Sequence, residues 1–180
     1  MQIKVGVMGS AGDVTAIKSL PEKGVALGQA IANRNLILLT GATTGVIYLV
    51  GKAARDAGAL HVGISPASCE QEHIKHYGLP TDACDLLIYT GFGLKGRNVV
   101  LVRSCDVVLF IAGAMGSLNE FTIAHDEGKV IGCLRGTGGV ADESDYLLER
   151  FSKPTGANVY QHEDAETLLA LCLEAAPERK

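Results

Sequence analysis

The segment that most constrains the fold is the apolar run Val107-Val108-Leu109-Phe110-Ile111 together with the turn that follows it. The run is continuous, of strand length and rich in β-branched residues, which is typical of a strand buried on both faces of a parallel sheet. The turn Ala112–Gly116 leads to Ser117 and then to a segment with helical character. A strand, a glycine turn and a helix start aim backbone N–H groups and the positive end of a helix dipole at one point. The segment therefore predicts an anion-binding site.

Two side chains in this segment have alternative interpretations. Ser117 is a favourable N-cap residue, and Glu120 follows it by three positions, which is the spacing of a capping box. In the first interpretation the two residues only cap the helix. In the second, Ser117 belongs to a phosphate site and Glu120 is a carboxylate beside it. The segment alone leaves both open.

Segments with strand character alternate with segments with helix character along the whole chain. The strands are expected at 3–8, 36–40, 60–65, 86–89, 107–111, 130–134 and 158–161. The helices are expected at 22–33, 46–57, 69–77, 95–104, from 118 onward, and at 142–151 and 164–175. This order predicts an α/β fold: a single-domain, doubly wound, mostly parallel Rossmann-like sheet with helices on both faces. We expect residues 1–176 to form this nucleotide-binding domain and residues 177–180 to form a flexible tail.

Composition argues against several classes of partner. The formal net charge is −4 and the chain has no Trp, which disfavours a nucleic acid or an anionic membrane surface as partner. No apolar run is long enough to span a bilayer and no signal peptide is evident, so we expect a cytoplasmic protein. The five cysteines are widely spaced without a CxxC pair, so no metal site is predicted. A small phosphorylated ligand, such as a nucleoside monophosphate, is compatible with this composition and net charge.

Glycine-containing turns follow five of the predicted strands. In a doubly wound sheet these turns share the edge at the carboxyl ends of the strands, where ligands bind. No turn matches G-x-G-x-x-G followed by an acidic residue at the end of the next strand, and no P-loop is present, which disfavours ordinary dinucleotide and P-loop sites. The residues predicted to bind phosphate or nucleotide are Gly9, Ser10, Gly41, Thr43, Thr44, Gly45, Gly113, Ala114, Met115, Gly116 and Ser117.

The order of several motifs resembles a known superfamily. The motifs are Gly41-x-x-x-Gly45-Val46, Gly63-Ile64-Ser65-Pro66, Arg97-Asn98, Ser104-Cys105-Asp106 and Gly113-x-x-Gly116-Ser117-x-x-Glu120. Together they resemble the lonely-guy or "lysine decarboxylase-like" superfamily, closest to the branch that contains the algal molybdenum cofactor carrier protein. The resemblance covers most of the chain and implies a Rossmann-like fold.

Enzymes of that superfamily hydrolyse the N-glycosidic bond of nucleoside 5'-monophosphates, and their signature is PGGxGTxxE with an upstream Arg. The resemblance places the catalytic pair on Arg97 and Glu120 and the phosphate site on the turn that ends at Ser117. A carboxylate near C1' could stabilise the oxocarbenium character of the transition state, and an arginine could hold the phosphate.

Three signature positions differ, with Ala112 for Pro, Ala114 for Gly and Ser117 for Thr. The Cβ of Ala114 would penalise a positive φ and fill space near a phosphate. These differences favour ligand binding over hydrolysis. The resemblance also implies molybdenum cofactor as a carried ligand, with no other cofactor indicated, and a homo-oligomer, a dimer or tetramer, that associates through the helix around 99–102.

Overall fold

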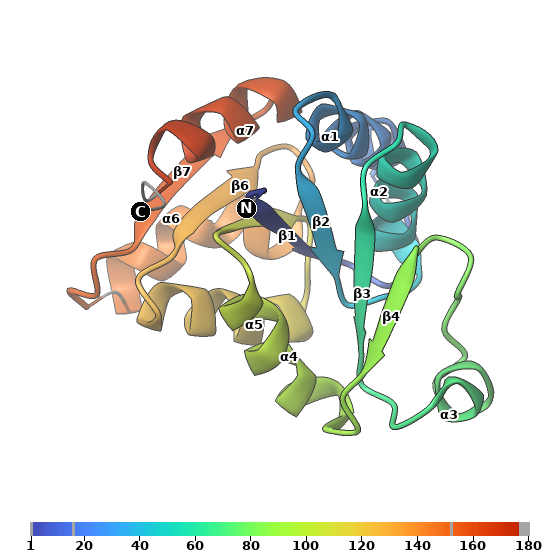
Figure 1. The fold of residues 1–180 in the computed structure, drawn as a ribbon. Helices are drawn as coiled ribbons and strands as arrows, with labels where there is room; N and C mark the ends of the chain where they lie inside the picture. The colour runs from blue at the N-terminus through green and yellow to red at the C-terminus, as the bar shows by residue number, and fades with distance from the viewer. Residues whose placement is uncertain (1, 16, 152, 177–180) are drawn as a thin grey trace.

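The computed structural model describes residues 2–15, 17–151 and 153–176. Within these residues seven strands form one sheet in the order β4-β3-β2-β1-β5-β6-β7, and every neighbouring pair is parallel (Figure 1). The strands are β1 (Lys4–Gly9), β2 (Ile37–Thr40), β3 (His61–Ser65), β4 (Leu86–Tyr89), β5 (Val107–Ile111), β6 (Val130–Leu134) and β7 (Asn158–His162). The predicted α/β doubly wound fold is confirmed, and its sheet is entirely parallel. The predicted tail at 177–180 lies outside the described residues.

Seven helices connect or follow these strands in the described residues. They are α1 (Leu20–Asn33), α2 (Gly45–Asp56), α3 (Glu70–Lys75), α4 (Gly93–Ser104), α5 (Met115–Asp126), α6 (Gly139–Phe151) and α7 (Ala165–Glu174). None of the helices in the described part of the chain is long and apolar enough to cross a bilayer.

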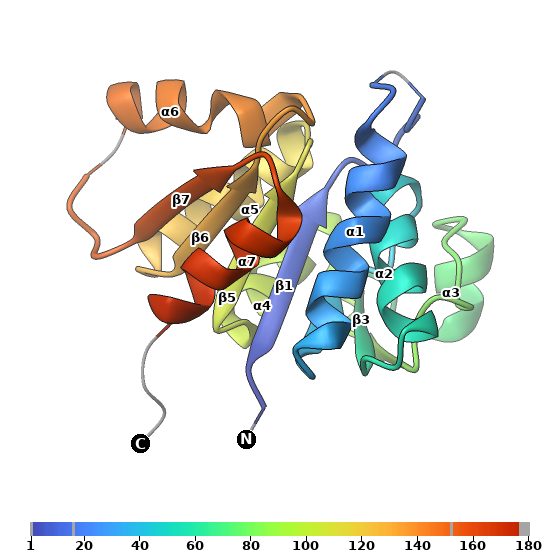
Figure 2. The same ribbon diagram turned by 90° about the horizontal axis from the view of Figure 1, so that it is seen from above.

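The helices lie on both faces of the sheet and divide the core in two (Figure 2). Alternate residues of each strand point to opposite faces, so β5 contributes Val107, Leu109 and Ile111 to one cluster and Val108 and Phe110 to the other. Helices α1, α2 and α7 pack on the first cluster. Helices α4, α5 and α6 pack on the second. All five residues of β5 are fully buried, as the continuous apolar run predicts.

Strand β1 lies at the point where the strand order reverses. The chain builds β2, β3 and β4 outward on one side of β1, and then returns to place β5 on the other side. In open parallel sheets the crevice at such a switch point, beyond the carboxyl ends of the strands, is where ligands bind. The loops after β1, β2 and β5 therefore surround the position at which a site is expected.

Candidate functional site

A cleft of about 490 Å³ lies beyond the carboxyl ends of β1 and β2, between α4 and the start of α5. Its position matches the switch point of the sheet. The sequence-predicted site residues that line it are Gly9, Ser10, Gly41, Thr43, Arg97, Ala114, Gly116, Ser117 and Glu120. Segments distant in sequence thus meet in one cavity, with both predicted catalytic side chains in its wall.

Four other predicted residues do not line the cleft. The hydroxyl of Thr44 donates to the carbonyl oxygen of Ala11 at 2.7 Å, and Gly45 packs against the backbone at Ser10 and Ala11. Gly113 is buried beneath Ser117, with its φ at +106°. The side chain of Met115 is exposed on the outside of the turn. These four residues shape the loops that form the cleft and do not form its surface.

Helix α5 begins three residues earlier than the capping-box interpretation requires. Its N-cap is Ala114 and Met115 is its first residue, so the prediction of Ser117 as N-cap and Glu120 as its capping partner is wrong. In the turn before the helix, Ala112 and Gly113 both adopt positive φ values, +55° and +106°, and the helix begins directly after Ala114. Ser117 lies inside the first turn, where its hydroxyl donates to the carbonyl oxygen of Gly9 at 3.1 Å. This bond ties α5 to the end of β1.

The strain predicted at Ala114 is absent. Its φ is −118°, in extended backbone that any residue adopts, and the positive φ values fall on its two predecessors instead. A Cβ built on Gly116 would meet nothing within 4 Å, so the backbone there faces open space. The alanine of this turn is therefore compatible with a phosphate approaching the first turn of α5.

Three of the helices that start at this edge of the sheet, α2, α5 and α6, differ in what their first N–H groups bind. In α2 the N–H of Val46 donates to Ser10 O at 3.1 Å. In α6 the N–H groups of Val140 and Ala141 donate to Gly113 O and Ala112 O at 3.0 and 3.1 Å. No side chain caps α5. The first turn of α5, at Gly116 and Ser117, thus presents backbone N–H donors and the positive dipole end to the cleft.

Arg97 is a buried cation in the wall of the cleft. It lies in the second turn of α4, its side chain is 6% exposed, and its Nη1 is 3.5 Å from Glu120 Oε1. Its guanidinium packs against Gly41, where a Cβ would lie 2.0 Å from Nη1. Its Nε finds no acceptor among the described residues. Burial lowers the pKa of Arg97, and the charge of Glu120 opposes that effect. A buried guanidinium with an unused donor favours an anionic ligand in the cavity.

Glu120 shares this wall and is held in a low-dielectric environment. Burial raises the pKa of its carboxyl to about 7, and the positive charges of Arg97 and Lys95 only partly offset it. The Asn98 side-chain amide lies between Asn119 and Glu120. With its nitrogen facing Glu120, it donates to Glu120 Oε1 at 3.1 Å and to Leu94 O at 3.0 Å. A carboxyl with a pKa near 7 can accept or donate a proton at neutral pH.

Two polar residues of the cleft were not among the predicted site residues. Lys95 is exposed at the cleft and Asn98 is buried beside Glu120. Both lie on α4 within three residues of Arg97. Lys95 lies two residues before Arg97 and Asn98 one residue after it, and side chains at these spacings do not share one face of a helix. The signal that could have found them is the basic side chain at 95 near the glycine turn before α4.

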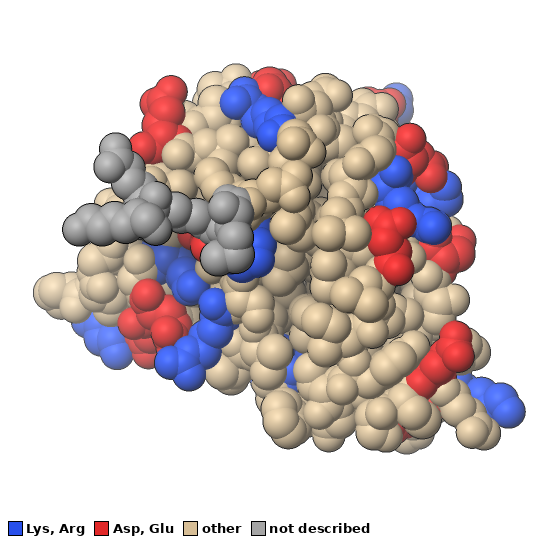
Figure 3. All heavy atoms as spheres, in the orientation of Figure 1, with Lys and Arg blue, Asp and Glu red and all other residues tan. Residues whose placement is uncertain are grey.

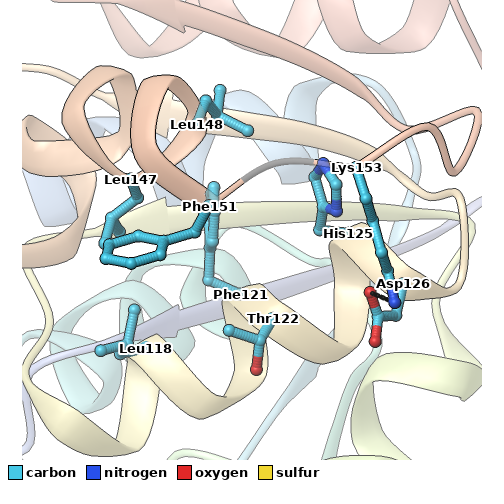
Figure 4. Close-up of a pocket in the computed structure, with 9 residues that line it drawn as sticks. All are labelled: Leu118, Phe121, Thr122, His125, Asp126, Leu147, Leu148, Phe151 and Lys153. Atoms are coloured by element: carbon cyan, nitrogen blue, oxygen red, sulfur yellow. Dashed lines mark ion pairs between the residues drawn. The ribbon is translucent and has the colours of Figure 1, made fainter.

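A second hollow, of about 240 Å³, lies between α5 and α6 (Figure 4). It is lined mainly by apolar side chains, among them Phe121 and Leu147, with Phe151 at its rim. Its ion pair joins Lys153 Nζ and Asp126 Oδ1 at 3.0 Å, so the lysine is already neutralised. It contains none of the predicted site residues and no uncapped helix start. Within the described residues no group of three or more His, Cys, Asp or Glu could hold a metal ion. The cleft at the switch point is therefore the candidate functional site.

Comparison with known proteins agrees with the fold. The sequence model described as the SLOG cluster4 family matches residues 2–169. A curated protein of Archaeoglobus fulgidus is 32% identical over 109 residues, a match that spans 61% of this chain and 66%, just under two thirds, of that protein.

Three solved structures share the whole fold. The crystal structure of the protein TM1055 has a TM-score of 0.84 at 27% identity and covers 97% of this chain and 99% of its own. The molybdenum cofactor binding protein of the phototrophic bacterium Rippkaea orientalis has a TM-score of 0.79 at 26% identity, over 97% and 98% of the two chains. The molybdenum cofactor carrier protein of Chlamydomonas reinhardtii has a TM-score of 0.76 at 27% identity, over 97% and 98%. These similarities support the predicted lonely-guy-type superfamily.

Proposed function

We propose that this chain, which belongs to the SLOG cluster4 family, binds a phosphorylated small molecule in the cleft between α4 and α5. The observation that carries the proposal is the buried Arg97, whose Nε has no acceptor among the described residues, in the wall of the same cavity as the uncapped start of α5. The cation and the helix dipole supply charge, and the backbone N–H groups supply directional donors for phosphate oxygens.

The ligand class is a nucleotide or a compound with a comparable phosphate. The cavity volume falls within the range of small-molecule sites. The phosphate would lie at the first turn of α5, near Gly116 and Ser117, with Arg97 as its cationic partner. The remainder of the ligand would extend toward Ser10, Thr43 and Leu94.

The test is calorimetric titration with nucleoside 5'-monophosphates and the corresponding nucleosides. We expect binding that requires the phosphate and that Arg97→Gln weakens about 10- to 100-fold, the cost of a lost hydrogen bond to a charged group. Arg103→Gln is the matched control, because Arg103 lies on the same helix, is 63% exposed and pairs with Glu127. Equal affinity for nucleosides and nucleotides would contradict the proposal.

A second candidate is the phosphoribohydrolase activity implied by the superfamily resemblance. The specific observation in its favour is the position of Glu120 in the cleft, 3.5 Å from Arg97 and with a pKa near neutrality. Such a carboxyl could orient water or stabilise a developing oxocarbenium ion. The assay is release of free base from a panel of nucleoside monophosphates. Release that persists in Glu120→Ala would remove the catalytic role of this carboxyl.

A third candidate is binding or carriage of molybdenum cofactor, as the names of two of the structural neighbours suggest. This ligand is a pterin with a phosphate, so it would use the same donors at α5. The chain would then hold the cargo without a chemical step. Recovery of a fluorescent oxidised pterin from the purified protein, lost in Arg97→Gln and kept in Arg103→Gln, would support this candidate. Absence of base release from every nucleotide would favour it over hydrolysis.

We also propose that the chain works in the cytoplasm and, from the same resemblance, that it forms a homo-oligomer, a dimer or tetramer. The contact expected around 99–102 needs revision, because Leu101 and Val102 are fully buried in the core of the chain itself. Only Val99 and Val100 of that segment are accessible to another molecule.

A further inference from the structure

The two carboxyl oxygens of Glu120 have different surroundings. Arg97 Nη1 lies 3.5 Å from Oε1, and the Asn98 amide, with its nitrogen facing Glu120, donates to the same oxygen at 3.1 Å. Within the described residues no donor reaches Oε2. Glu120 is buried and what remains accessible of it lines the cleft. A ligand in the cleft is therefore the partner available to Oε2.

The contact between Arg97 and Glu120 is longer than a closed ion pair. Hydrogen bonds between a guanidinium and a carboxylate measure about 2.7–2.9 Å and often form as two parallel bonds. Here one pair of atoms meets, at 3.5 Å, although both side chains are almost fully buried. Arg97 Nε also has no acceptor among the described residues. Glu120 thus leaves part of the guanidinium unused, and a ligand anion can share it.

The charges that act on Glu120 are those of two cations on α4, Arg97 and Lys95. Strands β5 and β6, which also contact α5, carry no charged residue. The one charged residue of β1, Lys4, lies at the end of that strand opposite to the cleft. Burial raises the pKa of the Cys105 thiol to about 12, so this group near Glu120 is neutral. A ligand phosphate would therefore be the anion that determines the charge state of Glu120.

The other acidic side chains of the neighbouring segments lie away from Glu120. Helix α6 packs on the opposite side of α5, across the hollow shown in Figure 4, and His125 and Asp126 of α5 line that same hollow. Asp13, in the loop after β1, accepts from Thr15 and does not line the cleft. Figure 3 shows a mainly uncharged surface over α4, with acidic side chains toward the margins of the view. Among the described residues Glu120 is the acidic group that lines the cleft.

We propose that Glu120 binds the phosphorylated ligand in its protonated form, donating from Oε2 to a ligand oxygen, so that the site takes up one proton from solvent together with the ligand. This inference rests on the proposed function, because it needs an anion beside Arg97 and the start of α5. An ionised carboxylate beside a phosphate dianion would place like charges together in a cavity of low dielectric, whereas a protonated carboxyl supplies a donor.

The proposal links affinity to pH in a defined direction. In the empty cleft the pKa of Glu120 is about 7, so the free chain holds the carboxyl protonated below that pH and ionised above it. Above pH 7 the proton must be taken up on binding, and the affinity should fall, approaching about 10-fold per pH unit. The ligand does not produce this trend, because a phosphate monoester has its second pKa at about 6 and stays a dianion in this range.

The experiment is titration calorimetry of the whole chain in buffers of different ionisation enthalpy, which counts the protons taken up. The probes are adenosine 5'-monophosphate and inorganic sulfate, a dianion that does not titrate near neutral pH. With sulfate we expect uptake of about 0.9 proton at pH 8 and about 0.1 at pH 6, the values for one carboxyl with a pKa near 7. With adenosine 5'-monophosphate we expect the same uptake at pH 8.

Glu120→Gln carries a neutral donor at every pH. We expect it to bind both probes without proton uptake, with an affinity that stays constant from pH 7 to 9. At pH 8.5 it should bind about 10- to 30-fold more tightly than the wild type, which must first protonate its carboxyl. Asp126→Asn is the matched control, because Asp126 lies on the same helix but pairs with Lys153 outside the cleft. It should keep the wild-type uptake.

The outcomes separate this inference from the proposed function. Binding of either probe by the wild type at pH 8 without proton uptake would overturn the inference, whether or not Glu120→Gln folds, and would leave the proposed function standing. Uptake that persists in Glu120→Gln, or in Glu120→Ala should the first variant not fold, would overturn it as well. Absence of binding of both probes at pH 6, where the wild-type carboxyl is already protonated, would remove both proposals.

Discussion

At the scale of single residues, Gly41 decides whether Arg97 can occupy its place in the wall of the cleft. A Cβ at position 41 would lie 2.0 Å from Nη1 and 2.6 Å from the central guanidinium carbon of Arg97. Gly41→Ala should displace the guanidinium, weaken binding of a phosphorylated ligand at least about 10-fold and lower stability by about 1–3 kcal/mol. Titration calorimetry and thermal unfolding measure the two effects.

The control for this prediction is Gly12→Ala. A Cβ there would meet only Ser10 Oγ, at 3.6 Å, which is ordinary contact. This variant should unfold like the wild type. If Gly41→Ala also binds a phosphorylated ligand and unfolds like the wild type, the position of the Arg97 guanidinium does not depend on a glycine at position 41.

The pKa of Glu120 predicts how stability depends on pH. Its folded-state pKa of about 7 lies above the ordinary value of 4.5, so between these two pH values the folded chain holds a proton that the unfolded chain has released. The free energy of unfolding should therefore fall as pH rises from about 4.5 to about 7, and the contribution of this group should stay constant above that. Glu120→Gln cannot titrate. Relative to it, the wild type should lose about 3 kcal/mol across this window, at about 1.4 kcal/mol per pH unit.

Urea unfolding at several pH values measures this difference. The comparison uses the change with pH and not the absolute stabilities, because the variant also leaves Arg97 without its ionic partner. A constant difference between wild type and variant from pH 4.5 to 8 would show that the carboxyl titrates at its ordinary pKa.

Residue types alone could not assign the roles of Ser117 and Thr44. Both are good N-cap residues by type, yet neither side chain caps a helix here. Their hydroxyls instead donate to carbonyl oxygens of the β1 loop, at Gly9 and Ala11. These partners are far away in sequence, so only the folded chain reveals them. The glycine pattern, in contrast, does place Gly9, Gly41 and Gly116 at the cleft, because it follows directly from the order of strands.

At the scale of elements, the start of α6 supports the turn that precedes α5. The Cβ of an alanine at Gly139 would lie 2.0 Å from Gly113 O, the carbonyl that accepts from Val140 N. Gly139→Ala should therefore separate the two turns, lower stability by more than about 3 kcal/mol and weaken ligand binding at α5. Thermal unfolding and ligand titration test this.

Gly156→Ala is its matched control. Both glycines have positive φ, +57° and +82°, so both alanines carry the backbone penalty of about 1–2 kcal/mol. Nothing lies within 4 Å of a Cβ at Gly156, so that variant should show the backbone penalty alone. Equal destabilisation of the two variants would mean that the contact between the turns does not contribute to the free energy of unfolding.

The sequence predicts the elements well but their starts less well. All seven strands lie within about a residue of their expected positions, because buried strands give continuous apolar runs. Five helices begin earlier than expected, and α5 and α6 do so by three residues each, at Met115 and Gly139. Several of these starts lie at glycines with positive φ, at positions 45, 93 and 139. A glycine that looks like part of a loop by composition is in these cases the first residue of the helix.

At the scale of the whole molecule, the order of strands places the cleft. The alternation of strands and helices predicts a doubly wound sheet, but not which strand lies beside which. The structure places β1 between β2 and β5, and that arrangement brings Gly41, Arg97 and Ser117 to one cavity. The exposure of one side of β4 could not be predicted from the sequence either, because the apolar segment Leu86–Tyr89 is typical of a buried strand. Exposure of its alternate residues depends on where α4 lies.

The most direct test of the central claim is a crystal structure of the chain with a nucleoside 5'-monophosphate bound. We predict that the phosphate lies in the cleft, within hydrogen-bond distance of the N–H groups of Gly116 and Ser117 and of the Arg97 guanidinium. A phosphate bound elsewhere, for example beside Lys153 in the hollow between α5 and α6, with the cleft left empty, would contradict the account.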